Sequence, residues 1–219
     1  MGETRLRTEE HRFYAPERSV LAQLRAFSPR RPLRYAEALR VAEHQASWLL
    51  HLAGVKEPPV PTDLLLNLPR IEVVVDEQPL ISGSAHWSGR RWVIVLNARE
   101  RARSQRLALA HELKHIIDHT TRSYLYTGMP GLTAAEQAER AADYFAGCLL
   151  VPRRWLRAAC WSGHRTSAAV GRLFQVPVPA ARNRLGQCGL APSGEDGSRR
   201  SPAASTRCNR ALRRKGRSG

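Results

Sequence analysis

The sequence contains no apolar run that approaches the roughly 20 residues needed to cross a membrane. Its first residues, Met1 to His11, also lack the apolar segment of a secretory signal. These two absences predict a cytoplasmic protein with no membrane partner. With 219 residues and 42% hydrophobic side chains, the chain can nevertheless form one domain with a core and extensions.

Paired cysteines are also missing. The four cysteines show none of the close spacings of a structural zinc site; they are Cys148, Cys160, Cys188 and Cys208. Disulfides are rare in the cytoplasm, so reduced thiols are expected.

Acidic residues are scarce. The chain has 19 Asp and Glu against 35 Lys and Arg, which gives a formal net charge of +16. Positive charge is densest over residues 191–219, a segment that is also rich in Ser, Gly and Pro and is therefore expected to be disordered. Such a tail either attracts nucleic acid or an acidic partner, or only keeps the protein soluble, and the second interpretation is favoured.

The most informative stretch is Leu107–His119, LALAHELKHIIDH, which contains an HExxH motif. Histidines four positions apart on a helix are separated by about 6 Å of rise and about 40° of rotation, so His111 and His115 can hold one metal ion. Glu112 would lie beside that ion and accept a proton from its water. The pattern predicts zinc-assisted hydrolysis, and the alternative is a helix, with Ser104 as N-cap, whose histidines bind no metal.

A catalytic zinc site needs a third protein ligand. His119 lies about 12 Å of rise beyond His111 on the same helix and cannot reach the same ion. Glu139 is the better candidate, on a second helix predicted over 133–152, where small neighbouring residues allow another helix to approach closely. Asp143 shares its face and would accept the outer ring N–H of a ligating histidine. The alternative is that both are ordinary surface carboxylates.

The segments before the motif predict a helix and a small sheet. A helix is expected over 35–53, a short helix over 63–68, a strand over 71–75 and a β-hairpin over 80–96. The second hairpin strand contains Trp92, Ile94 and Leu96. We expect it to be a sheet edge along which an extended substrate pairs, or otherwise a core strand.

Three short helices are expected after Pro152, over 153–160, 166–174 and 179–186. The last two have the spacing of a helix-turn-helix, and Arg182 and Arg184 lie on the later one. Packing or partner recognition is favoured over direct reading of DNA.

Two of these segments resemble a known family. AHELKH, followed after a loop by ERAADYFAGCLLVP, is similar to the ImmA/IrrE metallopeptidases, and the resemblance covers residues 36–190. It implies an α+β, zincin-like core in which a small antiparallel sheet packs on helices carrying HExxH and ExxxD, followed by short C-terminal helices. It also implies a gluzincin site, with Zn²⁺ on His111, His115 and Glu139 and with Glu112 as base. Known members act on helix-turn-helix repressors of mobile elements or stress responses.

Three positions depart from the family pattern. Lys114 stands where glycine is usual and is expected to alter substrate electrostatics. Ala141 replaces a second glutamate, and Asp143 replaces an asparagine while keeping an acceptor. None removes a catalytic group. The oxyanion donor stays open among Tyr124, Tyr126 and Tyr144.

The expected organisation is a basic, flexible arm over 1–34 with one short helix near 19–26, a metallopeptidase domain over 35–160, a helical segment over 161–190 and a basic tail over 191–219. The expected function is a zinc endopeptidase acting on a transcriptional repressor. The alternatives are a metal-stabilised anti-repressor that does not cut its partner and a DNA-binding regulator. Manganese or iron would suit the same donors.

Overall fold

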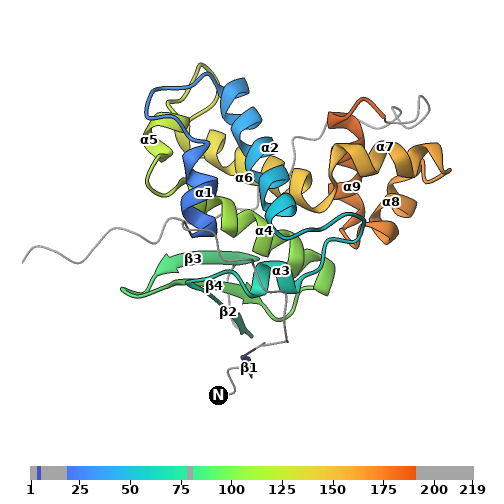
Figure 1. The fold of residues 1–219 in the computed structure, drawn as a ribbon, viewed down its shortest axis with the longest axis horizontal. Helices are drawn as coiled ribbons and strands as arrows, with labels where there is room; N and C mark the ends of the chain where they lie inside the picture. Colours follow the sequence, from blue (N-terminus) through green and yellow to red (C-terminus); the bar gives the residue numbers. More distant parts are fainter. Residues whose placement is uncertain (1–3, 6–18, 78–80, 191–219) are drawn as a thin grey trace, which may run out of the picture.

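The computed structural model describes residues 4–5, 19–77 and 81–190 (Figure 1). The expectations for the tail over 191–219, for Cys208 and for most of the N-terminal arm fall outside these ranges. Within the arm, the chain forms strand β1 (Thr4–Arg5) and helix α1 (Val20–Ala26), the latter where the sequence predicts a short helix.

The sheet is mixed, with the strand order β1-β2-β4-β3. Strands β3 (Gly83–Trp87) and β4 (Trp92–Asn97) form the predicted antiparallel hairpin. Strand β2 (Ile71–Asp76), however, pairs with β4 in parallel. The α+β fold class is confirmed, but the expectation of an antiparallel sheet is wrong for this pairing. Because β3 precedes β4 and runs opposite to β2, the hairpin turn brings β4 back in the direction of β2.

Strand β4 is an inner strand, since β2 and β3 flank it. The prediction that Trp92, Ile94 and Leu96 form a substrate-binding edge is therefore wrong, because both backbone edges of β4 pair with neighbouring strands. Ile94 and Leu96 are buried in the core. Trp92 packs its ring against those of Trp87 and His119. Among the described strands, β3 ends the sheet beside β4 and leaves its outer backbone edge unpaired.

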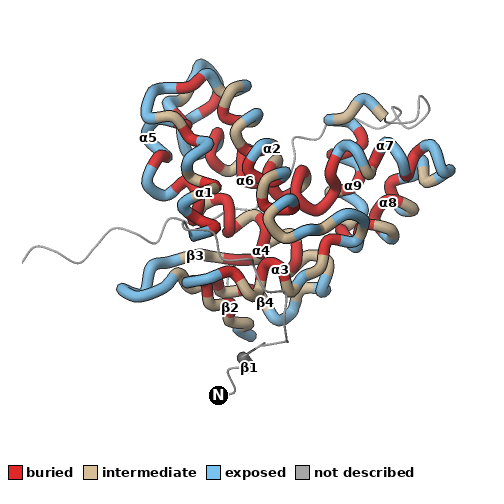
Figure 2. The backbone as a smooth tube through the Cα atoms, in the orientation of Figure 1, coloured by how far each residue is buried: buried red, intermediate tan, exposed pale blue. Residues whose placement is uncertain are grey.

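Three long helices build the rest of the core, namely α2 (Tyr35–Leu52), α4 (Ala102–Asp118) and α6 (Ala134–Leu150). Helix α4 lies against β3 and β4, and α6 packs on both α4 and α2 (Figure 1). The buried faces of α2 and α6 are rich in alanine, which permits close helix packing: Ala38, Ala42, Ala46, Ala138, Ala141, Ala142 and Ala146. Figure 2 shows buried residues along these helices, whereas the tip of the β3–β4 hairpin is exposed.

The sequence predicts the start of helix α6 correctly but not the start of helix α4. Helix α4 begins at Ala102 with Arg101 as N-cap, so Ser104 lies inside the first turn and the predicted cap is wrong. The amide of Gln105 already donates to the Arg101 carbonyl, which starts the helix earlier than the apolar pattern indicates. Helix α6 begins after Thr133 with the predicted capping box to Glu136.

The shorter helices are α3 (Asp63–Leu66), α5 (Arg122–Leu125), α7 (Arg153–Trp161), α8 (Ser167–Leu173) and α9 (Val178–Gln187). Helices α8 and α9 pack together, and Gly171 permits their approach, because a Cβ there would lie 3.1 Å from the Val176 carbonyl oxygen. Arg182 on α9 is exposed, but Arg184 is buried, so only one of these two arginines is available to contact DNA. No helix in the described ranges is both long and apolar enough to cross a membrane.

Candidate metal centre

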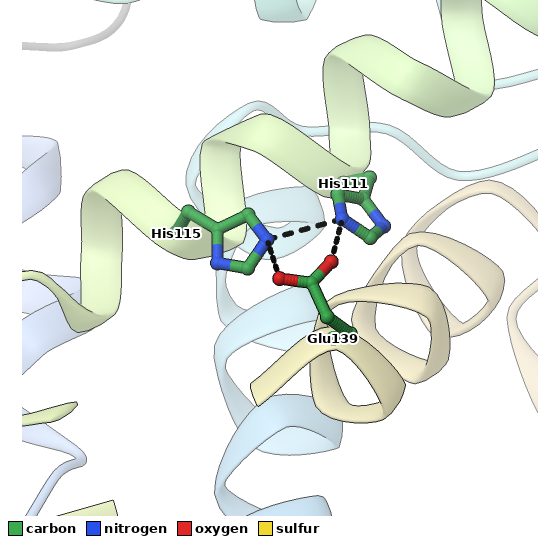
Figure 3. A group of neighbouring side chains, drawn as sticks. All are labelled: His111, His115 and Glu139. Atoms are coloured by element: carbon green, nitrogen blue, oxygen red, sulfur yellow. Dashed lines mark hydrogen bonds and ion pairs between the residues drawn. The ribbon is translucent and has the colours of Figure 1, made fainter. Parts of the chain in front are cut away.

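The two motif histidines leave α4 on the same face. His111 and His115 stand one turn apart, and their Nε2 atoms approach to 3.0 Å (Figure 3). This is the convergence that the four-residue spacing predicts.

Helix α6 brings Glu139 to the same point. Its Oε2 lies 3.3 Å from His111 Nε2, and its Oε1 lies 3.6 Å from His115 Nε2. Figure 3 shows the carboxylate facing both imidazoles across the gap between α4 and α6. One donor atom from each of the three residues lies within 4.8 Å of the other two. His119, at the end of α4, is exposed and lies outside this group.

The three side chains fit a divalent metal ion. Glu139 Oε2 is buried and makes no hydrogen bond, although it lies 3.3 Å from His111 Nε2, and a buried acceptor without a hydrogen bond is costly. Two imidazole nitrogens face the same space, so their lone pairs and the carboxylate can all be satisfied by one cation. Two nitrogen donors and one oxygen donor form a set that zinc favours, with room for a further ligand.

Asp143 contacts the outer side of His111, as predicted. Its Oδ1 lies 2.8 Å from His111 Nδ1, although 65% of the Asp143 side chain is exposed. Burial lowers the pKa of His111, but the carboxylates of Asp143 and Glu139 outweigh it and raise the pKa to about 10. Burial likewise raises the pKa of Glu139, and the two imidazoles outweigh it and lower the pKa to about 2. The site therefore concentrates negative charge around two basic nitrogens, which favours a bound cation.

Glu112 is buried beside the histidines, with 4% of its surface exposed. Burial raises the pKa of its carboxyl group, and the charges of His115 and His111 oppose the shift. Gly83 at the start of β3 makes room for it, because a Cβ at that position would lie 3.3 Å from Glu112 Cγ. The glycine therefore allows the end strand of the sheet to lie directly against the motif helix.

A cleft of about 480 Å³ opens next to this group. Its walls come from the start of β3, helix α4 and the turn before α9. Three residues of the metal-site region line it, namely His111, Glu112 and Asp143. The other lining residues are Ile81, Ser82, Gly83, Glu100, Ser104, Leu107, Ala108 and Pro177. Most of this wall was not predicted from the sequence. No local sequence pattern marks this wall, because segments distant in the sequence contribute to it. The one local indication is the glycine at the start of β3, a residue type that permits close approach of another element.

Lys114 does not face this cleft, contrary to the expectation that it alters substrate electrostatics. It is buried on another side of α4, where its Nζ donates to Asp118 Oδ1 at 2.6 Å and to Gln45 Oε1 at 2.7 Å. The Tyr126 hydroxyl donates to the other Asp118 oxygen at 2.6 Å. Lys114 thus joins α4 to α2, and Asp118 joins α4 to the segment after α5.

None of the three candidate tyrosines lines the cleft. Tyr126 is buried in the contact with Asp118, and the Tyr144 hydroxyl donates to Glu43 Oε2 at 3.1 Å. Tyr124 is partly exposed on α5. In this structure none of the three hydroxyl groups is therefore placed at the wall of the cleft.

Comparisons with known proteins agree with this geometry. The fold is similar to that of a Mycobacterium tuberculosis transcriptional regulator, with a TM-score of 0.54 and 18% sequence identity over 77% of this chain. The matched region is 52% of that protein, so the chain spans about half its length. Among curated proteins, none matches the sequence. Residues 74–186, more than half of the chain, match the Peptidase_M78 family, described as an IrrE N-terminal-like domain. This region includes α4 and α6, and because the match extends over more than half of the chain, the chain belongs to the ImmA/IrrE family, M78.

Proposed function

We propose that the protein is a zinc-dependent endopeptidase and that its substrate is a helix-turn-helix transcriptional repressor. The observation that carries the proposal is the position of Glu112, which is buried next to His111 and lines the same cleft. A metal that only stabilises the fold needs ligands but no additional carboxylate beside an open cleft. A hydrolytic site needs such a group to move a proton.

In the proposed reaction His111, His115 and Glu139 would hold the metal. When bound, the ion would supply Lewis acidity toward the scissile carbonyl and lower the pKa of a water molecule. Glu112 accepts a proton from the attacking water and returns it to the leaving amine. Asp143 accepts the Nδ1 proton of His111, which fixes the ring tautomer and directs Nε2 toward Glu139.

The end strand of the sheet offers a place for the substrate backbone. The outer edge of β3 is unpaired among the described strands, and the first residue of β3, Gly83, lines the cleft beside Glu112. An extended segment can add to such an edge through backbone hydrogen bonds. This moves the proposed substrate strand from β4, where the sequence suggested it, to β3.

Family membership and one structural neighbour support a repressor as the substrate class. The resemblance to ImmA/IrrE metallopeptidases implies a connection with helix-turn-helix repressors, and the mycobacterial protein of similar fold is a transcriptional regulator. A substrate of this class would be a cytoplasmic protein that presents an extended, accessible segment to the cleft.

The test compares the wild type with Glu112→Gln, and uses Glu57→Gln as a matched control at an exposed position. Bound zinc per chain is measured by elemental analysis, and cleavage of the repressor encoded nearest to the gene is followed by mass spectrometry. Both variants should retain metal, and Glu112→Gln should cleave at least about 100-fold more slowly. Metal-loaded wild type that binds the repressor without cutting it would refute the peptidase proposal and favour an anti-repressor. Metal-free protein would refute the site itself.

A further inference from the structure

A second, larger cavity lies away from the metal centre. It has a volume of about 650 Å³, within the usual range for sites that bind small molecules. The end of α2 and the loop after it, the end of α6, the start of α7 and one residue of α9 form its walls. Neither His111, Glu112 nor any other residue of the metal-site cleft lines it.

The lining of this cavity is strongly basic. Five cationic side chains line it against a single carboxylate, that of Glu43; the cations are Lys56, Arg153, Arg154, Arg157 and Arg184. The local charge is therefore +4. Basic residues are abundant throughout this chain, but here they surround a concave space, where low-dielectric walls strengthen their combined attraction for an anion.

The buried member of the set, Arg184, has an unused donor. Only 1% of the residue is exposed. Its Nε donates to the Val151 carbonyl at 3.0 Å and its Nη1 donates to Gln187 Oε1 at 3.2 Å. Its Nη2 is buried and makes no hydrogen bond, because Glu43 Oε1 lies 3.8 Å away. A charged donor left in this state is costly, and an anionic oxygen from a ligand would satisfy it.

Glu43 offsets only one of the five positive charges of the cavity, through two ion pairs that are longer than hydrogen bonds. Its Oε1 lies 3.9 Å from Arg153 Nε and 3.8 Å from Arg184 Nη2, beyond hydrogen-bond distance in both cases. Its other oxygen accepts the Tyr144 hydroxyl proton at 3.1 Å. The carboxylate therefore stays anchored to Tyr144 while the two guanidinium groups keep donors available.

The start of helix α7 forms part of the same wall. This nine-residue helix begins at Arg153 after Pro152, and both residues line the cavity. Its first turn has no acidic residue, and its N-cap makes no side-chain hydrogen bond. Free amide groups and the positive end of the helix dipole at such a terminus attract anions, phosphate groups in particular.

From these observations we infer that the cavity binds a small molecule carrying a phosphate or diphosphate group, which the guanidinium groups and the start of α7 hold together. Arginine suits this role, because its planar fork matches phosphate oxygens. This inference is independent of whether the metal centre cleaves peptide bonds.

The experiment measures binding of inorganic pyrophosphate to the full-length chain by isothermal titration calorimetry at constant ionic strength. Arg157→Gln removes one exposed cation from the cavity, and Arg182→Gln removes one exposed cation outside it, on α9. The first change should weaken binding about tenfold, the second less than about twofold. Equal weakening by both variants would mean that pyrophosphate is attracted nonspecifically to the basic protein, and would overturn the inference.

Further variants and ligands locate the anion and identify its source. In His115→Ala, which loses a proposed metal ligand, pyrophosphate affinity should be unchanged, whereas loss of binding would place the anion at the metal centre and overturn the inference. Arg184→Gln should abolish binding, with circular dichroism confirming the fold. If that variant does not fold, Arg154→Gln should give the same tenfold loss as Arg157→Gln.

ADP binding at least tenfold more tightly than pyrophosphate would identify a nucleotide as the source of the diphosphate. Equal affinity would leave the diphosphate group as the recognised feature. Tighter binding of a short single-stranded oligonucleotide than of either small molecule would overturn the assignment to a small ligand.

Discussion

Replacing Lys114 by methionine tests how far the metal-site helix depends on its buried ion pair. The side chains of Lys114 and Asp118 are 1% and 5% exposed, and the replacement leaves an unbranched side chain one heavy atom shorter while removing the charge. Two short hydrogen bonds are lost, to Asp118 Oδ1 and Gln45 Oε1. The Asp118 carboxylate then remains buried with Tyr126 as its hydrogen-bond donor.

The size of the effect follows from this geometry. Removing one member of a buried ion pair costs about 3–5 kcal/mol, because the other charge is left uncompensated. The remaining bond from Tyr126 favours the lower end, so we expect about 3 kcal/mol, or a fall in Tm of about 6–12 °C for a chain of this size. Adding Asp118→Asn should restore on the order of 1–2 kcal/mol, because it removes the unpaired charge.

Urea unfolding followed by circular dichroism provides the measurement. It is made on metal-free protein, since bound metal would add its own stabilisation. Lys56→Met is the control, because Lys56 is exposed and its replacement should change the free energy of unfolding by less than about 0.5 kcal/mol. A Lys114→Met protein as stable as the control, or a double variant no more stable than the single one, would refute the reasoning.

Three further predictions concern single side chains. Asp143→Ala should weaken zinc binding about 10–100-fold in a chelator competition, because His111 loses its Nδ1 acceptor, and an unchanged affinity would remove Asp143 from the site. Gly83→Ala should leave metal content intact but slow the proposed cleavage on the order of tenfold, because the new Cβ would lie only 3.3 Å from Glu112 Cγ and displace that side chain. An unchanged cleavage rate would mean that Glu112 accommodates the Cβ without losing its position. Burial raises the pKa of the Cys148 thiol to about 12, so a thiol-specific reagent at pH 8 should leave Cys148 unmodified in the folded protein and modify it after unfolding, as peptide mapping would reveal. Modification at the rate of a free cysteine would contradict this.

The sequence predicts those parts of the site that depend on helical repeat. His111 and His115 are related by one helical turn, and Glu139 and Asp143 by another, so the relative direction of each pair follows from local geometry alone. The capping box at Thr133 is equally local and is confirmed. The meeting of the two helices also rests on small residues, which are visible in the sequence.

Features that depend on distant pairings could not be predicted in this way. The order of β4 and β3 is decided by which strand lies beside β2, and an apolar alternation is compatible with an inner strand or an edge strand. Lys114 and Arg184 look like surface cations in a sequence that is rich in them. Both are buried because partners at Gln45 and Val151, distant in sequence, satisfy their donors.

The unpaired edge of β3 also has a consequence for solubility. An open strand edge can pair with the same edge of a second molecule, so proteins usually protect such edges. Here β3 is only five residues long, and its partly buried first half lies next to the cleft, while its end carries the exposed His86 and Trp87. If this edge receives substrate, covering it would remove function. In that case the short length of the strand and the repulsion between molecules that each carry a formal charge of +16 are the two features that would oppose pairing of this edge with a second copy.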